Sequence, residues 1–459
     1  MSDHELLGPS GLKHAECISG SLDWWTSPLM ETSVEGGYYT TYFPDTPLSE
    51  SANSVFFKVP ACDDLIDLND SFCKISLQIL KADGTNIDAF TAPTQQAPGN
   101  SVGFIQMPAT SIFSSCNFIL NGENLSDTFA NYHYTSYFQT ILNYNSDARK
   151  SRLQLMGFYE DEDVTDNDAS DAADETGFKT RASLTKLSHE ATFISNIFHG
   201  MWSQARFLPA LIPFSLEWIK APASFCLKSN ATSPAFKYKI TKMELFIRKI
   251  KVKSSRKLEL ENKLEKSPAL FPLVNSNCRP FFINRNAKQV SFENCFQGRS
   301  IPSYCVIGLV AQTNYRGQYD TSPYDFKNFS LTKLSMSIDG DSYPSPHAFE
   351  PDYTSTTAPD HTREYLALFN NQLKVDSGSF ITYDMYKNNG FCLYVINFGL
   401  EMDQKYKDHI VPKRAGSCRL DISFANASSN PPLVAVMYSE WEETLSIDKL
   451  RKIKRDFHL

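Results

Sequence analysis

Alternation of apolar and polar residues is the dominant pattern of this chain, and it predicts β-strands. In Cys73–Leu80 every second residue from 75 to 79 is apolar, so these side chains lie on one face of a strand. The longest alternating segments are Lys237–Lys253 and Leu433–Leu445. We take the first as the last strand of an N-terminal β-domain and the second as the last strand of a C-terminal one.

A β-unit occurs twice. Phe113–Gly122 alternates, ends in Asn-Gly, and is followed by the aromatic, helix-like segment Asn131–Leu142. Leu331–Gly340 alternates, ends in Asp-Gly, and precedes the helix-like segment Thr362–Phe369. Asn-Gly and Asp-Gly tolerate positive φ and so reverse a β-chain. The repeat predicts two similar β-domains in one polypeptide.

A charged helical segment separates the two β-rich halves. Arg256–Glu265 is rich in helix formers, lacks Gly and Pro, and is followed by Pro268. Many short strands with irregular connections favour antiparallel sandwiches. We therefore expect an all-β protein of two tandem antiparallel jelly rolls, with short helices in the loops and in the connector. The expected division is an N-terminal arm at 1–50, a first jelly roll at 51–253 with an acidic exposed loop at 160–175, a helical connector at 254–268, a second jelly roll at 269–447 and a basic tail at 448–459.

Composition supports two sizeable cores. The chain has 459 residues, of which 42% are hydrophobic and 13% aromatic, so it is neither disordered nor limited to one domain. A net charge of −8 argues against a uniformly basic nucleic-acid coat but leaves room for a local basic patch. We find no secretory signal and no stretch long enough to span a membrane. Ten scattered cysteines without a Cys-x-x-Cys pair predict reduced, buried thiols in a protein made in the cytosol.

Catalytic motifs are absent from the sequence. It contains no glycine-rich phosphate loop, no His-Glu-x-x-His and no Gly-x-Ser-x-Gly, and its nine histidines lack ligand spacing. We therefore expect no enzyme activity, no catalytic or metal-binding residues and no cofactor. The nine carboxylates between Glu160 and Glu175 are Ca²⁺-type ligands, but without EF-hand spacing we favour a solvated loop. His133, flanked by tyrosines, is expected to be a packed aromatic-cluster residue.

The N-terminal arm contains candidate interface residues. Trp24, Trp25, Tyr38 and Tyr39 lie in a segment of weak periodicity. Tryptophan and tyrosine are enriched at interface hot spots, so the arm is expected to dock on a neighbouring subunit or on its own domain.

The C-terminal tail is basic. Lys449–Arg455 carries five cations in seven residues. A solvated tail is the interpretation we favour, and a contact with nucleic acid or a nuclear-import signal is the alternative.

An ordered series of segments resembles the capsid proteins of Maverick/Polinton elements and adintoviruses. The segments are Asp67–Gly84, Ile112–Gly122 with the tyrosine-rich stretch and Leu142–Ser151 after it, Leu245–Val252 with its helical continuation, Tyr315–Phe329, Phe349–Tyr353 and Arg363–Phe369. This resemblance implies a double jelly roll that forms homotrimers, whose six jelly rolls make pseudo-hexagonal capsomers of an icosahedral shell. It supplies no catalytic residues.

The leading hypothesis is therefore a major capsid protein. Its expected partners are further copies of itself, minor capsid or penton proteins, and packaged DNA through the basic tail. It would be made in the host cytosol and end in the virion, with the nucleus as a candidate place of assembly. The alternative is a tandem jelly-roll binding module, or a penton-type vertex protein that binds a receptor or carbohydrate. A cupin-like enzyme would need a histidine set that the sequence does not offer.

Overall fold

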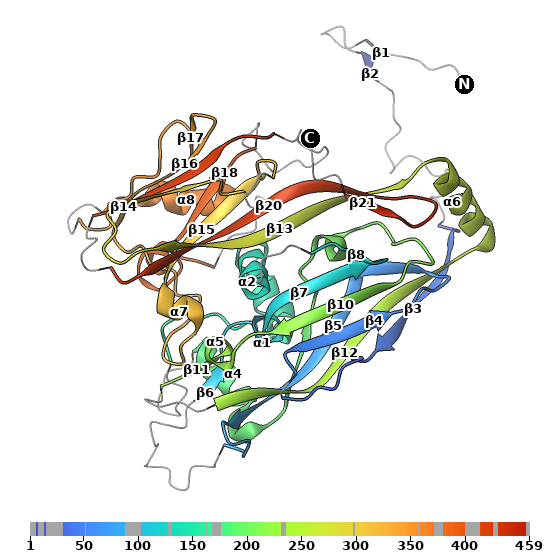
Figure 1. Ribbon diagram of the computed structural model, residues 1–459, viewed down its shortest axis with the longest axis horizontal. Coiled ribbons are helices and arrows are strands. Elements are labelled where there is room, and N and C mark those ends of the chain that lie inside the picture. The colour runs from blue at the N-terminus through green and yellow to red at the C-terminus, as the bar shows by residue number, and fades with distance from the viewer. Residues whose placement is uncertain are drawn as a thin grey trace.

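The computed structural model describes residues 6–7, 13–14, 31–50, 52–87, 102–126, 131–144, 146–161, 163–167, 176–230, 236–296, 299–355, 359–370, 380–399, 414–425 and 430–455. Within these ranges the molecule consists of two antiparallel β-sandwiches (Figure 1). The N-terminal sandwich is blue to green and the C-terminal one is yellow to red in Figure 1.

The first sandwich has two four-stranded sheets. One has the order β3 (Val34–Tyr42), β12 (Phe236–Val252), β5 (Leu65–Lys81), β9 (Ala191–Ser195). The other has the order β4 (Ser54–Val59), β10 (Phe214–Lys220), β7 (Phe113–Leu120), β8 (Glu123–Asn124).

The second sandwich repeats this order strand for strand. One sheet is β13 (Ala269–Ile283), β20 (Leu433–Ile447), β15 (Tyr304–Ala311), β18 (Leu393–Asn397), and the other is β14 (Gln289–Glu293), β19 (Cys418–Phe424), β16 (Leu331–Ile338), β17 (Asp341–Tyr343). Eight strands in two facing sheets with this connectivity form a jelly roll. The fold is therefore a double jelly roll, as the sequence predicted.

Helices and short strands lie in the connections. The helices are α1 (Pro108–Ser111), α2 (Tyr132–Asn143), α3 (Ser146–Arg149), α4 (Gly177–Leu184), α5 (Ala223–Cys226), α6 (Ser254–Lys266), α7 (Gln312–Arg316), α8 (Thr362–Asn370) and α9 (Tyr383–Asn388). The 3₁₀ helices are η1 (Arg152–Met156), η2 (Lys186–Ser188) and η3 (Gly200–Ser203). The remaining strands are β1 (Leu6–Leu7), β2 (Lys13–His14), β6 (Val102–Phe104), β11 (Leu227–Ser229) and β21 (Ile453–Arg455). Helix α6 forms in the predicted connector.

Both predicted reversals are hairpin turns. Asn121 and Gly122 have φ of 47° and 89°, and Asp339 and Gly340 have φ of 51° and 100°. Two consecutive positive φ values are typical of the type I′ turn, which matches the twist of the flanking strands. A Cβ atom added at Gly122 or Gly340 would meet nothing within 4 Å, so the glycines are needed for their backbone conformation rather than for space.

The predicted boundaries differ from the structure at both ends. Val34–Tyr42, placed in the arm, is the edge strand β3 and pairs with β12 from Val34 to Tyr42. Its start was missed because Gly36 and Gly37 interrupt the alternation and its first six residues are exposed. Part of the tail is strand β21, which pairs with the end of β20. Residues 456–459 of that tail are outside the described residues.

One hydrophobic core runs through both sandwiches. Its buried members include Phe57, Phe118 and Leu245 in the first half and Val306 and Tyr438 in the second. The two jelly rolls are thus packed as one body rather than tethered by a linker.

Candidate assembly site

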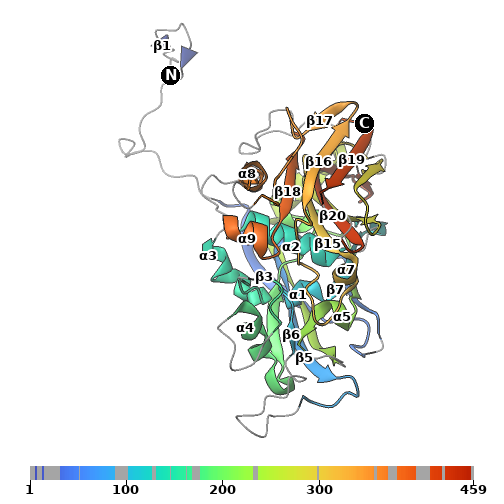
Figure 2. The same cartoon turned by 90° about the vertical axis from the view of Figure 1, so that its left-hand side faces the viewer.

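Helix α2 lies between the two jelly rolls, in the middle of the molecule in both views (Figures 1 and 2). Tyr137 stacks on Tyr324 of the second half, with ring centroids 4.0 Å apart and planes 2° apart. Tyr134 meets the same ring edge-on at 5.6 Å. Phe138 packs against Phe326 at 5.4 Å. These aromatic pairs make the interface an extension of the core.

Hydrogen bonds across this interface fix the relative position of the two jelly rolls. Asn131 Nδ2 donates to the carbonyl of Cys278 (2.9 Å), and its Oδ1 accepts from the hydroxyl of Tyr315 (3.1 Å). The Tyr134 hydroxyl donates to the carbonyl of Pro323 (2.9 Å). Such directional bonds hold the two sandwiches at one relative position.

His133 is buried in α2, as expected for a packed residue. Its ring meets Phe225 edge-on at 4.1 Å, and burial lowers the pKa of the imidazole from 6.5 to about 3. A histidine held neutral in this way is a structural group.

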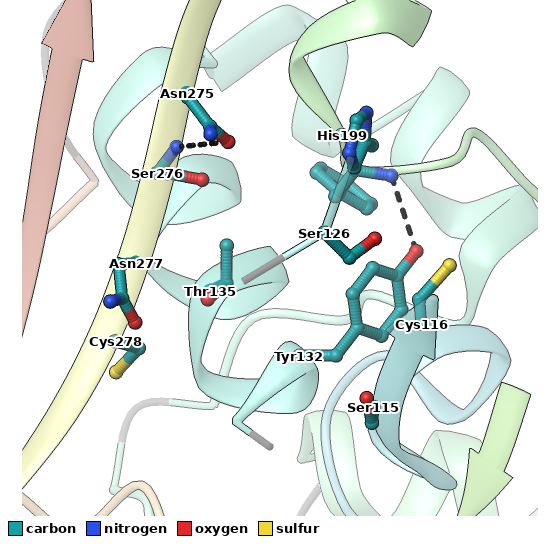
Figure 3. A pocket seen from close by; sticks show the side chains of 11 residues that line it. Ser115, Cys116, Ser126, Tyr132, Thr135, His199, Asn275, Ser276, Asn277 and Cys278 are labelled. Atoms are coloured by element: carbon teal, nitrogen blue, oxygen red, sulfur yellow. Dashed lines mark hydrogen bonds between the residues drawn. The ribbon is translucent and has the colours of Figure 1, made fainter. Parts of the chain in front are cut away.

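A small cavity of about 50 Å³ lies between α2 and strand β13 (Figure 3). Tyr132, whose hydroxyl accepts from the amide of Phe198 (3.2 Å), and the thiols Cys116 and Cys278 are among its lining side chains. Burial raises the pKa of both thiols, which removes nucleophilic character. The cavity has room for a few water molecules.

The C-terminal segment fastens the two halves together. In this clasp, residues 448–455, Arg451 forms a bidentate ion pair with Glu261 of α6 (2.8 and 2.9 Å), and its Nε donates to the carbonyl of Ala210 (3.1 Å). Arg455 pairs with Glu443 (3.0 Å) and donates to the carbonyl of Leu125 (2.9 Å). The expectation of a plain solvated tail is therefore wrong for these two arginines, since Arg451 lies in the turn before β21 and Arg455 on the strand itself, and both bind partners in the fold.

The acidic segment is likewise only partly exposed. Asp161 is 6% exposed and makes a bidentate ion pair with Arg181 (3.0 and 3.1 Å). Buried Lys228 donates to the carbonyls of Val164 (2.7 Å) and Asp166, and burial lowers its pKa to about 8. Residues 168–175 are outside the described residues.

Two of the four predicted interface residues are described. Tyr38 and Tyr39 lie on β3 and are 40% and 50% exposed. The Tyr38 hydroxyl donates to Asp64 (2.7 Å), and the Tyr39 ring packs 5.7 Å from Phe72. Trp24 and Trp25 lie outside the described residues. Both tyrosines therefore rest on their own domain while presenting free ring area.

A second exposed apolar set lies around the clasp. Leu211, Leu258, Leu270 and Leu450 are each at least 50% exposed. Arg451 links their elements through Ala210 and Glu261, and Arg206 reaches the carbonyl of Leu270. Exposed apolar side chains on elements that the clasp contacts are candidates for association between copies.

Other site chemistries find no support in the described ranges. There, no three His, Cys, Asp or Glu side chains gather to hold a metal ion. No helix within those ranges has the length and apolar character to cross a membrane.

Comparisons of the sequence alone do not identify the fold. No family model matches the chain. One sequence relative is the uncharacterized protein F54H12.2 of Caenorhabditis elegans, 21% identical over 350 residues, which cover 75% of this chain and 79% of that protein.

Three solved structures have a fold similar to that of this chain. A chain of the Sputnik virophage aligns with a TM-score of 0.64 and 12% identity, covering 97% of this chain and 94% of that one. The Faustovirus major capsid protein gives 0.55 and 10%, covering 92% of each chain. The mavirus major capsid protein gives 0.53 and 11%, covering 98% and 97%. The fold is that of viral capsid proteins. At these identities the likeness concerns the fold alone.

The interface role of α2 is the main feature that the sequence analysis missed. Ten of its twelve residues are buried. A helix buried on nearly all sides belongs inside a protein, and its run of aromatic residues was the available signal.

Proposed function

We propose that this protein is a major capsid protein that assembles as a homotrimer. The observation that carries the proposal is the identical strand order of the two jelly rolls, joined rigidly through α2 and the clasp. Three such bodies present six similar sandwiches, which approximate a hexagon and can tile a closed shell. The full-length fold likeness to the Faustovirus and mavirus major capsid proteins supports this function.

The finer parts of the proposal follow from the same function. The capsomers form an icosahedral shell of the Maverick/Polinton and adintovirus type, completed by minor capsid or penton proteins. The protein acts in the virion, after synthesis in the host cytosol and assembly in the nucleus. Trp24, Trp25, Tyr38, Tyr39 and the apolar set around the clasp are the proposed contacts between copies.

Packaged DNA is the proposed partner of the outward side of the clasp. Arg451 and Arg455 are occupied by ion pairs, whereas Lys449, Lys452 and Lys454 are exposed. Three surface lysines give a weak, salt-dependent contact with phosphates. Substituting the three lysines with glutamine should reduce binding to double-stranded DNA at low salt and leave the thermal midpoint unchanged. Equal binding by both proteins refutes this contact.

Light scattering coupled to size exclusion tests the proposal. We expect a particle of three times 51.8 kDa that associates further into shells or sheets visible by electron microscopy. A stable trimer should bury well over 2,000 Å² in total, as obligate assemblies do. A protein that stays monomeric at micromolar concentration refutes the capsid function and favours the binding-module alternative.

A further inference from the structure

Two cysteines of the second jelly roll lie in contact at one end of the sandwich. Strands β14 and β19 pair as far as Glu293 and Arg419. Cys295 follows β14 after Asn294, which has φ of 52°, and Cys418 is the first residue of β19. The thiols of Cys295 and Cys418 interact with each other, and the Cys295 thiol donates to the carbonyl of Phe292 (3.2 Å). The strand ends therefore hold the two sulfurs side by side.

The two thiols have unequal surroundings. The guanidinium of Arg279 lies beside Cys295 and donates to its carbonyl (2.9 Å). The interaction with Cys418, together with this positive charge, lowers the pKa of Cys295, whereas the interaction with Cys295 and burial raise the pKa of Cys418. Cys295 is thus the sulfur that ionises first and the better nucleophile of the pair.

A pocket of about 10 Å³ lies beside Cys295, which is 1% exposed. Arg279, Cys295 and Ser439 are among its lining residues. The hydroxyl of Ser439, which is 2% exposed, has no hydrogen-bond partner in the described part of the chain. A buried unsatisfied hydroxyl beside a space of this size indicates a polar molecule about as large as water.

We propose that Cys295 and Cys418 form a peroxide-responsive thiol pair that closes to a disulfide. Hydrogen peroxide is a thiol oxidant close to water in size, and the pocket excludes bulky disulfides such as oxidised glutathione. The Cys295 thiolate attacks one peroxide oxygen, so an S–O bond forms, the O–O bond breaks, and the released hydroxide becomes water. Cys418 then attacks the sulfur of the resulting sulfenic acid, the S–S bond forms, and its proton leaves with the hydroxyl as a second water. Two thiols and one peroxide thus give one disulfide and two waters.

Cys305 is the competing partner and supplies the matched control. It is fully buried, it lies near Cys295 and Cys418, and its sulfur is 3.5 Å from the sulfur of Met336. No hydrogen bond between Cys305 and Cys295 is seen in the described residues, so Cys305→Ala should leave the reaction intact.

Peptide mapping of the folded protein after a peroxide titration tests the pair. We expect a Cys295–Cys418 linkage with the mass of two hydrogens lost, reversed by a thiol reductant and unchanged in Cys305→Ala. Cys418→Ala should instead accumulate a sulfenic acid at Cys295, which the peptide map detects as one added oxygen. The wild-type map alone decides the matter if a variant does not fold. Oxidation of the partly exposed Cys62 while Cys295 and Cys418 stay reduced overturns the proposal, as does a linkage to Cys305 or a reaction that needs denaturant.

Discussion

Replacing Arg451 by alanine should loosen the fastening between the jelly rolls. The Arg451 side chain is 11% exposed and Glu261 is 40% exposed. A charge-assisted hydrogen bond contributes about 1.5–3 kcal/mol when buried, and partial exposure of the carboxylate reduces this toward the surface value of about 1 kcal/mol or less. The variant also leaves the carbonyl of Ala210 without its donor and removes the packing of the arginine stem. We therefore expect Arg451→Ala to lower the free energy of unfolding by about 2–3 kcal/mol.

A double-mutant cycle measures how much the Arg451–Glu261 ion pair contributes to the free energy of unfolding. Urea unfolding of the wild type, Arg451→Ala, Glu261→Ala and the double variant gives a coupling energy, which we expect to be about 1 kcal/mol. Lys452→Ala is the matched control, because this neighbouring cation is exposed and should change stability by less than about 0.5 kcal/mol. A coupling energy of zero, or an equal loss in the control, refutes the clasp as a stabilising contact.

Three further predictions concern the interface and the surface. His133 is neutral in the fold and has an ordinary pKa when unfolded, so its contribution to stability is complete well above pH 6.5 and is lost as pH falls from 6.5 toward 3. His133→Phe should therefore lose about 2 kcal/mol less than the wild type between pH 6.5 and 4.5, measured by chemical unfolding at each pH, and parallel losses contradict this. Tyr324→Ala should lower the unfolding free energy by about 4 kcal/mol by removing the ring stacked on Tyr137, whereas Tyr324→Phe should lower it by about 1 kcal/mol; equal effects would show that the ring contributes nothing. Replacing both Tyr38 and Tyr39 by serine should weaken trimers in light scattering with little change in thermal midpoint, and an unchanged trimer excludes them from the interface.

Local patterns were sufficient for the half-buried strands that alternate, for the two turns and for the connector. Alternation in Cys73–Leu80 predicted a strand because one face of β5 is buried, and Asn121-Gly122 predicted a reversal because the dipeptide itself favours the required backbone. The edge strand β3 was missed because an exposed strand needs no apolar alternation and is held by its hydrogen bonds to β12.

Ion pairs between residues far apart in the chain could not be predicted from the sequence. Asp161 lies in a run of carboxylates, and nothing local distinguishes it from its neighbours, yet it alone among them meets Arg181 at both carboxylate oxygens in the described structure. Arg451 and Arg455 likewise look like any basic tail. Their partners, Glu261 and Glu443, are positioned by tertiary packing, which charge composition does not encode.

The two copies of the repeated unit use their helices differently, and this limits the symmetry of the proposed capsomer. Helix α2 of the first copy is enclosed between the jelly rolls, whereas α8 of the second packs beside β18 and leaves Leu366 57% exposed (Figure 2). The contact between sandwiches within one chain therefore joins the helix of one to the strands of the other and is not reciprocal. A ring of six jelly rolls has two kinds of contact, which alternate. One joins the two jelly rolls of a single chain, which α6 also connects covalently, and the other joins jelly rolls of different chains. Two chemically different contacts cannot be equivalent, so the proposed ring would be threefold in symmetry and hexagonal only in outline.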